Sequence, residues 1–251
     1  MASETATPGI FWANSGVMSS KKEVLPYETY AKWYEDVHIP DWMGAKPGAI
    51  TAAWRYQSLD PDRASSLPFL VLYKYPDIIS DISAPEFRTV RLDHDSPLPG
   101  GGPVNSFAQF EVLAGSHVET WRASAAGDDR GPLLVTETIA PCDIPTEEFN
   151  TWYRESHINE ITKLEGWRRT TLFDGGFSRQ PKWFALHEFE DDSFGSRATE
   201  KFRLLLVNST GPKIGDEIIK KADLAIWKLI RVYGDATTSW GRQGGDKIIE
   251  V

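Results

Sequence analysis

The sequence predicts an α+β fold built from two copies of a β-α-β-β-α-β unit, whose antiparallel sheets face each other and form an α+β barrel. Three observations support this prediction. A 15-residue pattern occurs twice, 119 positions apart, and the same elements follow it in the same order each time. A four-stranded sheet with helices on one face also leaves an apolar face that must be buried. Two such faces can bury each other, and the barrel interior is then a natural place for a small-molecule cavity.

The repeated pattern occupies residues 26–40 and 145–159. The aligned residues are Trp33 with Trp152, Tyr34 with Tyr153, His38 with His157, Ile39 with Ile158 and, after small gaps, Gly48 with Gly166 and 69–77 with 184–192. Chance could repeat a Trp-Tyr pair, but it would hardly repeat the flanking elements in order. We therefore interpret the chain as a tandem duplication.

In the first half, the apolar run Gly9–Val17 is bounded by Gly and Ser, which is typical of a strand. Pro26 begins a helix, because Pro suits the first helical turn and Glu28 complements the positive end of the helix dipole. This helix should end by Ile39, because Pro40 disfavours the helical conformation in the residue before it. The remaining elements are predicted as strands at 49–57, Phe69–Tyr75 and 106–113 and a helix at 85–94.

The second half repeats this order. Its predicted elements are strands at Leu133–Ile139, Trp167–Asp174, Trp183–Phe189 and 225–232, and helices at 146–158 and 197–206. We expect a first repeat at 9–114, a linker rich in Ala, Ser, Gly and Asp at 115–131, a second repeat at 132–234 and a flexible tail at 235–251.

Composition argues against several classes of partner. The net charge of −9, with no cluster of Lys and Arg, disfavours nucleic acid and anionic membrane surfaces. No apolar stretch approaches the roughly 20 residues that span a bilayer, and residues 1–8 lack the basic and apolar segments of a signal peptide. The single cysteine, Cys142, fits a reducing compartment. We expect a cytoplasmic monomer or homodimer whose partner is an apolar small molecule.

The Trp-Tyr-x-x-x-His-Ile-Pro ending of the first predicted helix, Trp33 to Pro40, resembles the EthD-like branch of the dimeric α+β barrel superfamily, which has a ferredoxin-like fold. Members with one repeat usually dimerise to complete the barrel, so this chain is similar to a fused pair. The second copy departs from the motif, since Asn159 stands where Pro40 stands in the first. The resemblance implies cofactor-independent cyclases and decarboxylases of polyketide-like compounds, small monooxygenases, isomerases or haem enzymes, and fold alone does not choose among them.

The best catalytic candidates are His38 and Tyr34, which share a helix face at i, i+4 spacing. A neutral imidazole beside a phenol can pass a proton, and the ordinary pKa of His, near 6.5, suits that role. Alternatively, His38 and His157 complement the helix dipole or pack a helix end. The spacings from His38 to Asp41 and from His157 to Glu160 could supply metal ligands only if both pairs converged, so we expect no metal site.

Further candidates lie on strands. His187 shares a strand face with Trp183, and the alignment gives it Leu72 as its first-half counterpart. A polar residue that breaks the repeat is informative, so we predict that His187 is catalytic together with His38 and Tyr34. The predicted substrate-binding residues are Arg55, Tyr73, Trp54, Arg169, His157 and Trp183. An Arg that points into an apolar cavity would bind a carboxylate or enolate through two parallel hydrogen bonds, whereas an Arg at a strand edge would only face solvent.

These residues predict a cofactor-independent lyase or cyclase that transfers protons during decarboxylation, cyclisation or isomerisation. Its substrate would be an aromatic or polyketide-like compound of secondary metabolism. The alternatives are a protein that binds such a compound without catalysis and a barrel enzyme that uses haem or oxygen. Broken symmetry between the halves favours His38 and His187 for chemistry and leaves His157 to support its helix end.

Overall fold

The computed structural model describes residues 6–90, 103–139, 144–176, 182–190, 222–235, 237 and 246–250. The chain divides into two compact units. Unit 1 consists of Met1–Ser116 and Ile230–Ala236, and unit 2 of His117–Leu229 and Thr237–Val251. None of the described helices is both long and apolar enough to cross a membrane.

The strands form one closed hydrogen-bonded order, β1-β3-β2-β8-β5-β7-β6-β4, because β4 also pairs with β1. A further strand, β9, lies beside β4. The strands are β1 (Gly9–Val17), β2 (Ala52–Ser58), β3 (Phe69–Tyr75), β4 (Ala108–Ala123), β5 (Leu133–Ile139), β6 (Trp167–Asp174), β7 (Trp183–Phe189), β8 (Ala222–Gly234) and β9 (Lys247–Ile249). The predicted fold class, an α+β barrel with antiparallel strands, is confirmed.

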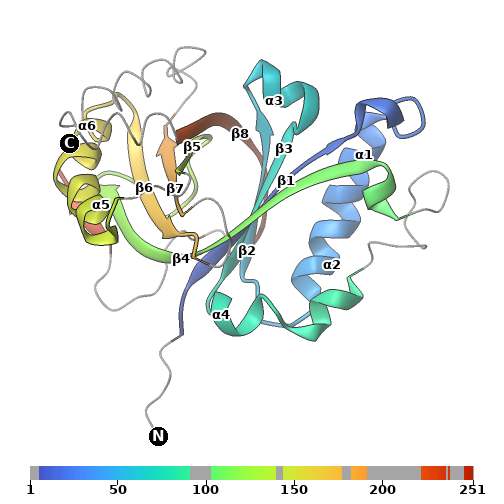
Figure 1. The fold of residues 1–251 in the computed structure, drawn as a ribbon, viewed down its shortest axis with the longest axis horizontal. Helices are drawn as coiled ribbons and strands as arrows, with labels where there is room; N and C mark the ends of the chain where they lie inside the picture. The colour runs from blue at the N-terminus through green and yellow to red at the C-terminus, as the bar shows by residue number, and fades with distance from the viewer. Residues whose placement is uncertain are drawn as a thin grey trace, which may run out of the picture. The chain divides into compact units, whose positions relative to one another are not determined.

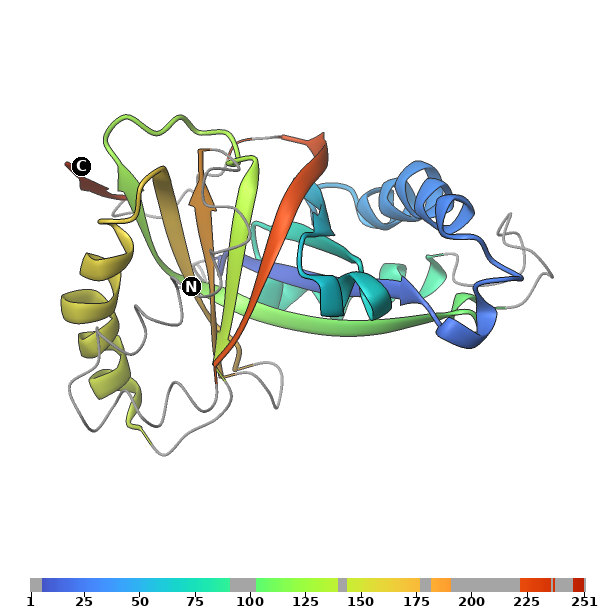
Figure 2. The same ribbon diagram turned by 90° about the horizontal axis from the view of Figure 1, so that it is seen from above.

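The helical segments follow the same order around the two repeated patterns. They are η1 (Ser19–Lys21), α1 (Tyr27–Trp33), the π-helix η2 (Tyr34–His38), α2 (Ile39–Gly44), α3 (Pro61–Ser66), α4 (Ile78–Asp81), η3 (Pro85–Thr89), η4 (Val104–Ser106), α5 (Thr146–Trp152), the π-helix η5 (Tyr153–His157) and α6 (Ile158–Ile161). Figures 1 and 2 show α1, η2 and α2 as one continuous helix beside the strands of unit 1.

In unit 1, the helix packs on one face of the sheet. Side chains alternate along β3, so that Phe69, Val71, Tyr73 and Tyr75 join the helix residues in one hydrophobic core. The register pairs Phe11 of β1 with Tyr73. Unit 2 has the same arrangement, in which α5, η5 and α6 form a core with alternate residues of β5 and β7. Figure 2 shows this second helix beside β6.

The first helix does not end at Ile39 as predicted. It continues through α2 to Gly44, and Ile39 keeps helical angles, with φ of −63° and ψ of −49°. Pro40 falls in the first turn of α2, where the missing N–H leaves no hydrogen bond of α2 unmade. The preceding π turn, η2, shifts the hydrogen-bond register and so accommodates the proline within a continuous helix.

Two predicted boundaries also differ from the structure. Residues 115–123, predicted as linker, are the second half of β4, in which Gly115 and Ser116 pair with β1 and residues 121–123 pair with β9. Within the predicted tail, β9 pairs in parallel with β4, where Trp121 lies opposite Lys247. The predicted helix at 197–206 lies outside the described residues. Of the helix predicted at 85–94, Pro85–Thr89 forms a 3-10 turn, and residues 91–94 lie outside the described residues.

Candidate functional site

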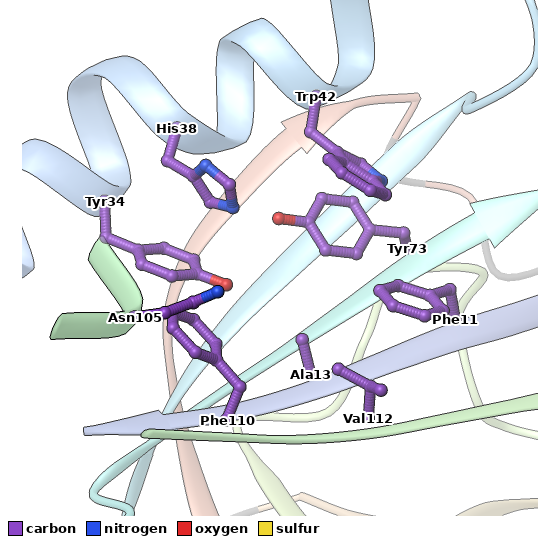
Figure 3. Close-up of a pocket in the computed structure, with 9 residues that line it drawn as sticks. All are labelled: Phe11, Ala13, Tyr34, His38, Trp42, Tyr73, Asn105, Phe110 and Val112. Atoms are coloured by element: carbon purple, nitrogen blue, oxygen red, sulfur yellow. The ribbon is translucent and has the colours of Figure 1, made fainter. Parts of the chain in front are cut away.

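A pocket of about 170 Å³ lies in unit 1, between the helix and the sheet (Figure 3). Its lining residues are Phe11 and Ala13 of β1, Tyr34 and His38 of η2, Trp42 of α2, Tyr73 of β3, Asn105 of η4, and Phe110 and Val112 of β4. Aromatic rings supply most of the wall, and Val112, which is 52% exposed, marks its outer edge. We expected a cavity within the barrel, and this pocket lies instead on the helix-covered face of one sheet.

The π turn brings two polar side chains to the same wall. Tyr34 begins η2 and His38 ends it, and their rings meet edge-on with centroids 4.6 Å apart. Across the pocket, Tyr73 projects from β3, so that its hydroxyl and the imidazole of His38 point toward each other (Figure 3). The structure therefore brings together three of the residues that the sequence singled out.

His38 is held as a neutral imidazole. It is only 6% exposed and stacks on Trp33 with ring centroids 5.2 Å apart. Burial, aided by the positive charge of Arg55, lowers the pKa of His38 to about 4. Its Nδ1 atom has no hydrogen-bond partner among the described residues. A base that is unprotonated at neutral pH thus lies at the pocket wall.

The two phenols of the pocket remain protonated at neutral pH. Burial raises the pKa of Tyr73 well above 10 and also raises that of Tyr34. The nearby Arg55 opposes part of this rise in both cases. The two hydroxyls also interact with each other, and either can donate a hydrogen bond to an oxygen atom in the pocket.

Arg55 lies behind the pocket wall and does not line it. Its side chain is fully buried, and its guanidinium lies 4.5 Å from the ring centroid of Tyr34 and 3.8 Å from that of Phe69. Its charged neighbour is Glu35, at 3.7 Å between Nε and Oε1. Arg55 thus adds positive charge near the pocket through the Tyr34 ring. It does not line the pocket, so it does not donate the two parallel hydrogen bonds to a ligand that the sequence predicted.

Unit 2 contains a second, filled group of polar side chains. Nε2 of His157 lies 3.1 Å from Oε2 of Glu137, and Nε2 of His187 lies 3.3 Å from the same atom. The other ring nitrogen of His187 bonds to the hydroxyl of Thr170 at 3.0 Å. All four side chains are buried. Although burial alone would raise the pKa of Glu137, the two imidazoles lower it to about 2.

The remaining predicted residues lie apart from the pocket. Trp183 stacks on Phe149 in the core of unit 2, with ring centroids 3.8 Å apart. Arg169 donates a 2.7 Å hydrogen bond to the carbonyl of Gly127. Trp54 of β2 is fully buried and is not among the residues that line the pocket.

The sequence alignment gave Leu72 as the counterpart of His187, but the structural counterpart is the next residue, Tyr73. Tyr73 and His187 both point toward the helix of their unit, while Leu72 points to the opposite face of β3. In the strand pairs, Tyr73 lies opposite Phe11, and His187 lies opposite Val135. The polar change between the halves is therefore Tyr73 to His187. A period-of-two comparison of the two strands would have found it.

Sequence reasoning missed the apolar pocket residues, above all Ala13, Trp42 and Phe110. In a sequence, an apolar side chain that lines a pocket looks the same as one that fills a core. Trp42 alone carried a signal, since it lies four positions after His38, but the helix was expected to end before it. Among the described residues, no group of three or more His, Cys, Asp and Glu side chains is placed to hold a metal ion.

Comparison with known proteins places the fold more firmly than the family. No protein-family model matches the sequence. Core atranone cluster (CAC) protein 1 of Stachybotrys chlorohalonatus is 22% identical over 202 residues, which cover 73% of this chain and 82% of that protein. A proposed monooxygenase of Fusobacterium nucleatum is 12% identical with a TM-score of 0.55, covering 96% of this chain and 98% of its own.

A variant of the chlorite dismutase of Candidatus Nitrospira defluvii is also 12% identical, with a TM-score of 0.57 and coverage of 89% and 91% of the two chains. At these identities the likeness shows that the chain shares the fold of these structures. The EthD-like resemblance and the tandem duplication stay predictions.

Proposed function

We propose that this protein is an enzyme that binds an apolar, aromatic or polyketide-like small molecule in the unit 1 pocket and transfers a proton during its decarboxylation, cyclisation or isomerisation. The observation that carries this proposal is the neutral imidazole of His38, which points into an aromatic pocket together with the hydroxyl of Tyr73 (Figure 3). Base, donors and apolar walls thus meet in one small space.

In this mechanism His38 takes a proton from an acidic carbon of the substrate. The electrons left on carbon move onto an adjacent carbonyl oxygen, which becomes an enolate. Tyr34 and Tyr73 donate hydrogen bonds to that oxygen, as oxyanion donors do. The buried guanidinium of Arg55 further favours negative charge near the Tyr34 ring. His38 then returns the proton at the position that defines the product.

The named relative supports a role in biosynthesis. Its name assigns it to an atranone cluster, and we extend to this chain a role in making a secondary metabolite. The sequence analysis left two alternative functions, and both can be tested. A protein that only binds would hold the same ligand without proton exchange, and an oxygen-using enzyme would consume oxygen during turnover. The monooxygenase description of a fold neighbour favours testing the latter.

A haem group does not fit the pocket. Its volume of about 170 Å³ can hold an aromatic ring with a short side chain, but not a flat macrocycle of four pyrrole rings. His157 and His187, two possible axial ligands in unit 2, are fully buried and already bonded to Glu137. We therefore derive no step through haem.

The first test uses benzoylacetone, an aromatic diketone with an acidic CH₂ group. Exchange of its CH₂ protons for deuterium is followed by NMR in buffer, with wild-type protein and with His38→Gln. Wild-type protein should accelerate exchange, and the variant should lose about 10²–10⁴-fold of that acceleration, which is the usual contribution of a general base. His117→Gln is the matched control, since His117 is a buried histidine of unit 2 that bonds to Thr120.

The outcomes separate the candidates. Acceleration that survives in His38→Gln would contradict the role of His38. Binding of the diketone without any acceleration would support a non-catalytic binding protein, and oxygen uptake during turnover would support the oxygen-using alternative.

A further inference from the structure

The two units surround their π-turn histidines in the same way. Trp33 stacks on His38 at 5.2 Å, and Trp152 stacks on His157 at 4.8 Å. The tyrosine that begins each turn meets the same histidine edge-on, at 4.6 Å in unit 1 and 5.0 Å in unit 2. The surroundings of one histidine are therefore a physical guide to those of the other.

The strands extend this correspondence to one decisive position. Ala13 lies opposite the β3 residue that comes two places before Tyr73. Glu137 lies opposite the β7 residue that comes two places before His187. Ala13 and Glu137 therefore hold the same register position, on the face of the sheet that the helix covers.

The space at this register position is filled by a carboxylate in unit 2 and is open in unit 1. The carboxylate of Glu137 lies between the imidazoles of His157 and His187, at 3.1 and 3.3 Å. Ala13 has no polar group, and it lines the pocket from β1, across from His38 on the helix (Figure 3). The space that holds a carboxylate in unit 2 is thus part of the pocket in unit 1.

We propose that the ligand of unit 1 carries an acidic group, a carboxylate or an enolate oxygen, and that this group occupies the place that the Glu137 carboxylate fills in unit 2. The proposal rests on the proposed function of this pocket and narrows its substrate class to aromatic acids and acidic enols. It also makes Ala13 a specificity-determining residue, because any larger side chain there would take the space of the acidic group.

The charges around the pocket support an anion. None of the described residues that line it is Asp or Glu, while the imidazole of His38 and the hydroxyls of Tyr34 and Tyr73 can donate hydrogen bonds. Arg55 lies opposite Val71, the register position that Leu172 holds in unit 2. Unit 1 therefore carries a buried cation near the pocket where unit 2 has an apolar side chain. The nearby Glu35 offsets this cation only partly, since the two lie 3.7 Å apart and Glu35 is partly exposed to solvent.

The test compares two probes of similar size, benzoate and benzyl alcohol, in the wild-type chain at neutral pH. Binding is measured by calorimetry and by the NMR shift of the His38 ring protons. Benzoate should bind roughly tenfold more tightly or better, because hydrogen bonds to a charged acceptor are the stronger ones. It should also shift the His38 signal.

Two variants test the position itself. Ala13→Glu places a carboxylate beside His38, so it should abolish benzoate binding and raise the pKa of His38, as read by NMR titration. Ala13→Gln has the same size without the charge, so it should block benzoate yet leave the His38 titration near its wild-type value. Melting curves confirm that each variant is folded, and the probe comparison in the wild-type chain needs neither variant.

Each outcome decides a separate point. Equal binding of the two probes would overturn the acidic-group proposal and leave the pocket and its proton-transfer function standing. An unchanged His38 titration in folded Ala13→Glu would overturn the equivalence of Ala13 and Glu137. Absence of binding by both probes, together with no exchange of benzoylacetone, would overturn the proposed function as well.

Discussion

His38 and His157 end identical π turns, yet their nitrogen atoms face different surroundings. Nε2 of His157 lies 3.1 Å from Oε2 of Glu137, whereas unit 1 has Ala13 at the register position of Glu137. A histidine that is buried without a counter-charge must stay neutral, and this sets the pH at which it can act as a base. The difference between a structural and a reactive histidine therefore arises from one strand position, Ala13 against Glu137.

The first prediction concerns the pH dependence of His38. Because burial and Arg55 lower its pKa to about 4, the acid limb of kcat/KM should fall near pH 4 and not near the ordinary value of about 6.5. Between these values the unfolded chain binds more protons than the folded chain, so folded stability should decrease as the pH falls through this window. Arg55→Met should raise the pKa of His38 only in part, since burial, the larger cause, remains.

NMR titration of the His38 ring measures this pKa directly, with the wild-type chain and Arg55→Met compared in the same buffer. A His38 signal that titrates near pH 6.5 in the wild-type chain would contradict the prediction. A variant that titrates at the same pH as the wild-type chain would show that the charge of Arg55 does not reach the imidazole.

At the scale of elements, the π turn is the feature that builds the site. An α-helix turns by about 100° per residue, so one residue inserted or removed rotates every later side chain by that angle. Inserting one alanine between Val37 and His38 adds a residue beyond the one that the π turn already accommodates, so it should rotate His38 by about 100° away from the pocket wall. We expect retained helical circular dichroism with loss of benzoylacetone exchange.

The matched control is the insertion of one alanine between Ser156 and His157, which makes the same change in η5 of unit 2. It should lower the melting temperature, because it separates His157 from Glu137, and spare exchange in the protein that remains folded. If the alanine insertion before His38 leaves exchange intact, the π turn is not what positions the base.

The sequence predicted most strands well, and the reasons for its failures are physical. Phe69–Tyr75 and Leu133–Ile139 have the predicted bounds, because β-branched and aromatic runs end at turn residues. The helix past Pro40 was missed, because the π turn that accommodates the proline depends on hydrogen-bond register and not on residue type. In the candidate site, the sequence singled out His38, Tyr34 and Tyr73. It could not find Ala13, whose importance lies in the small size of its methyl side chain.

At the scale of the molecule, the two units use one pattern for different ends. Unit 1 keeps an open pocket beside its histidine, and unit 2 closes the same space with the Glu137 carboxylate, which is in hydrogen-bond contact with two imidazoles. Removing one partner of such a buried group leaves polar atoms without hydrogen bonds, which costs stability. We therefore expect substitutions in unit 1 to lower turnover and the matched substitutions in unit 2 to lower the stability of the fold.

The last prediction tests this division with Glu137→Gln. Glu137 has a folded pKa of about 2 against an ordinary 4.5, so it contributes stability above pH 4.5 that is lost as the pH falls through 2. The substitution should cost about 3–5 kcal/mol of unfolding free energy at neutral pH, which is the usual loss when one partner of a buried pair is removed. Denaturant unfolding at pH 7 measures this loss. A double-mutant cycle with His157→Gln should give a coupling of about 0.5–3 kcal/mol, since the two side chains are in contact.

Exchange of benzoylacetone per folded molecule should not change. If Glu137→Gln or His187→Ala stays folded but loses exchange, the chemistry involves unit 2, and the sequence-based prediction that His187 is catalytic would replace the division drawn here.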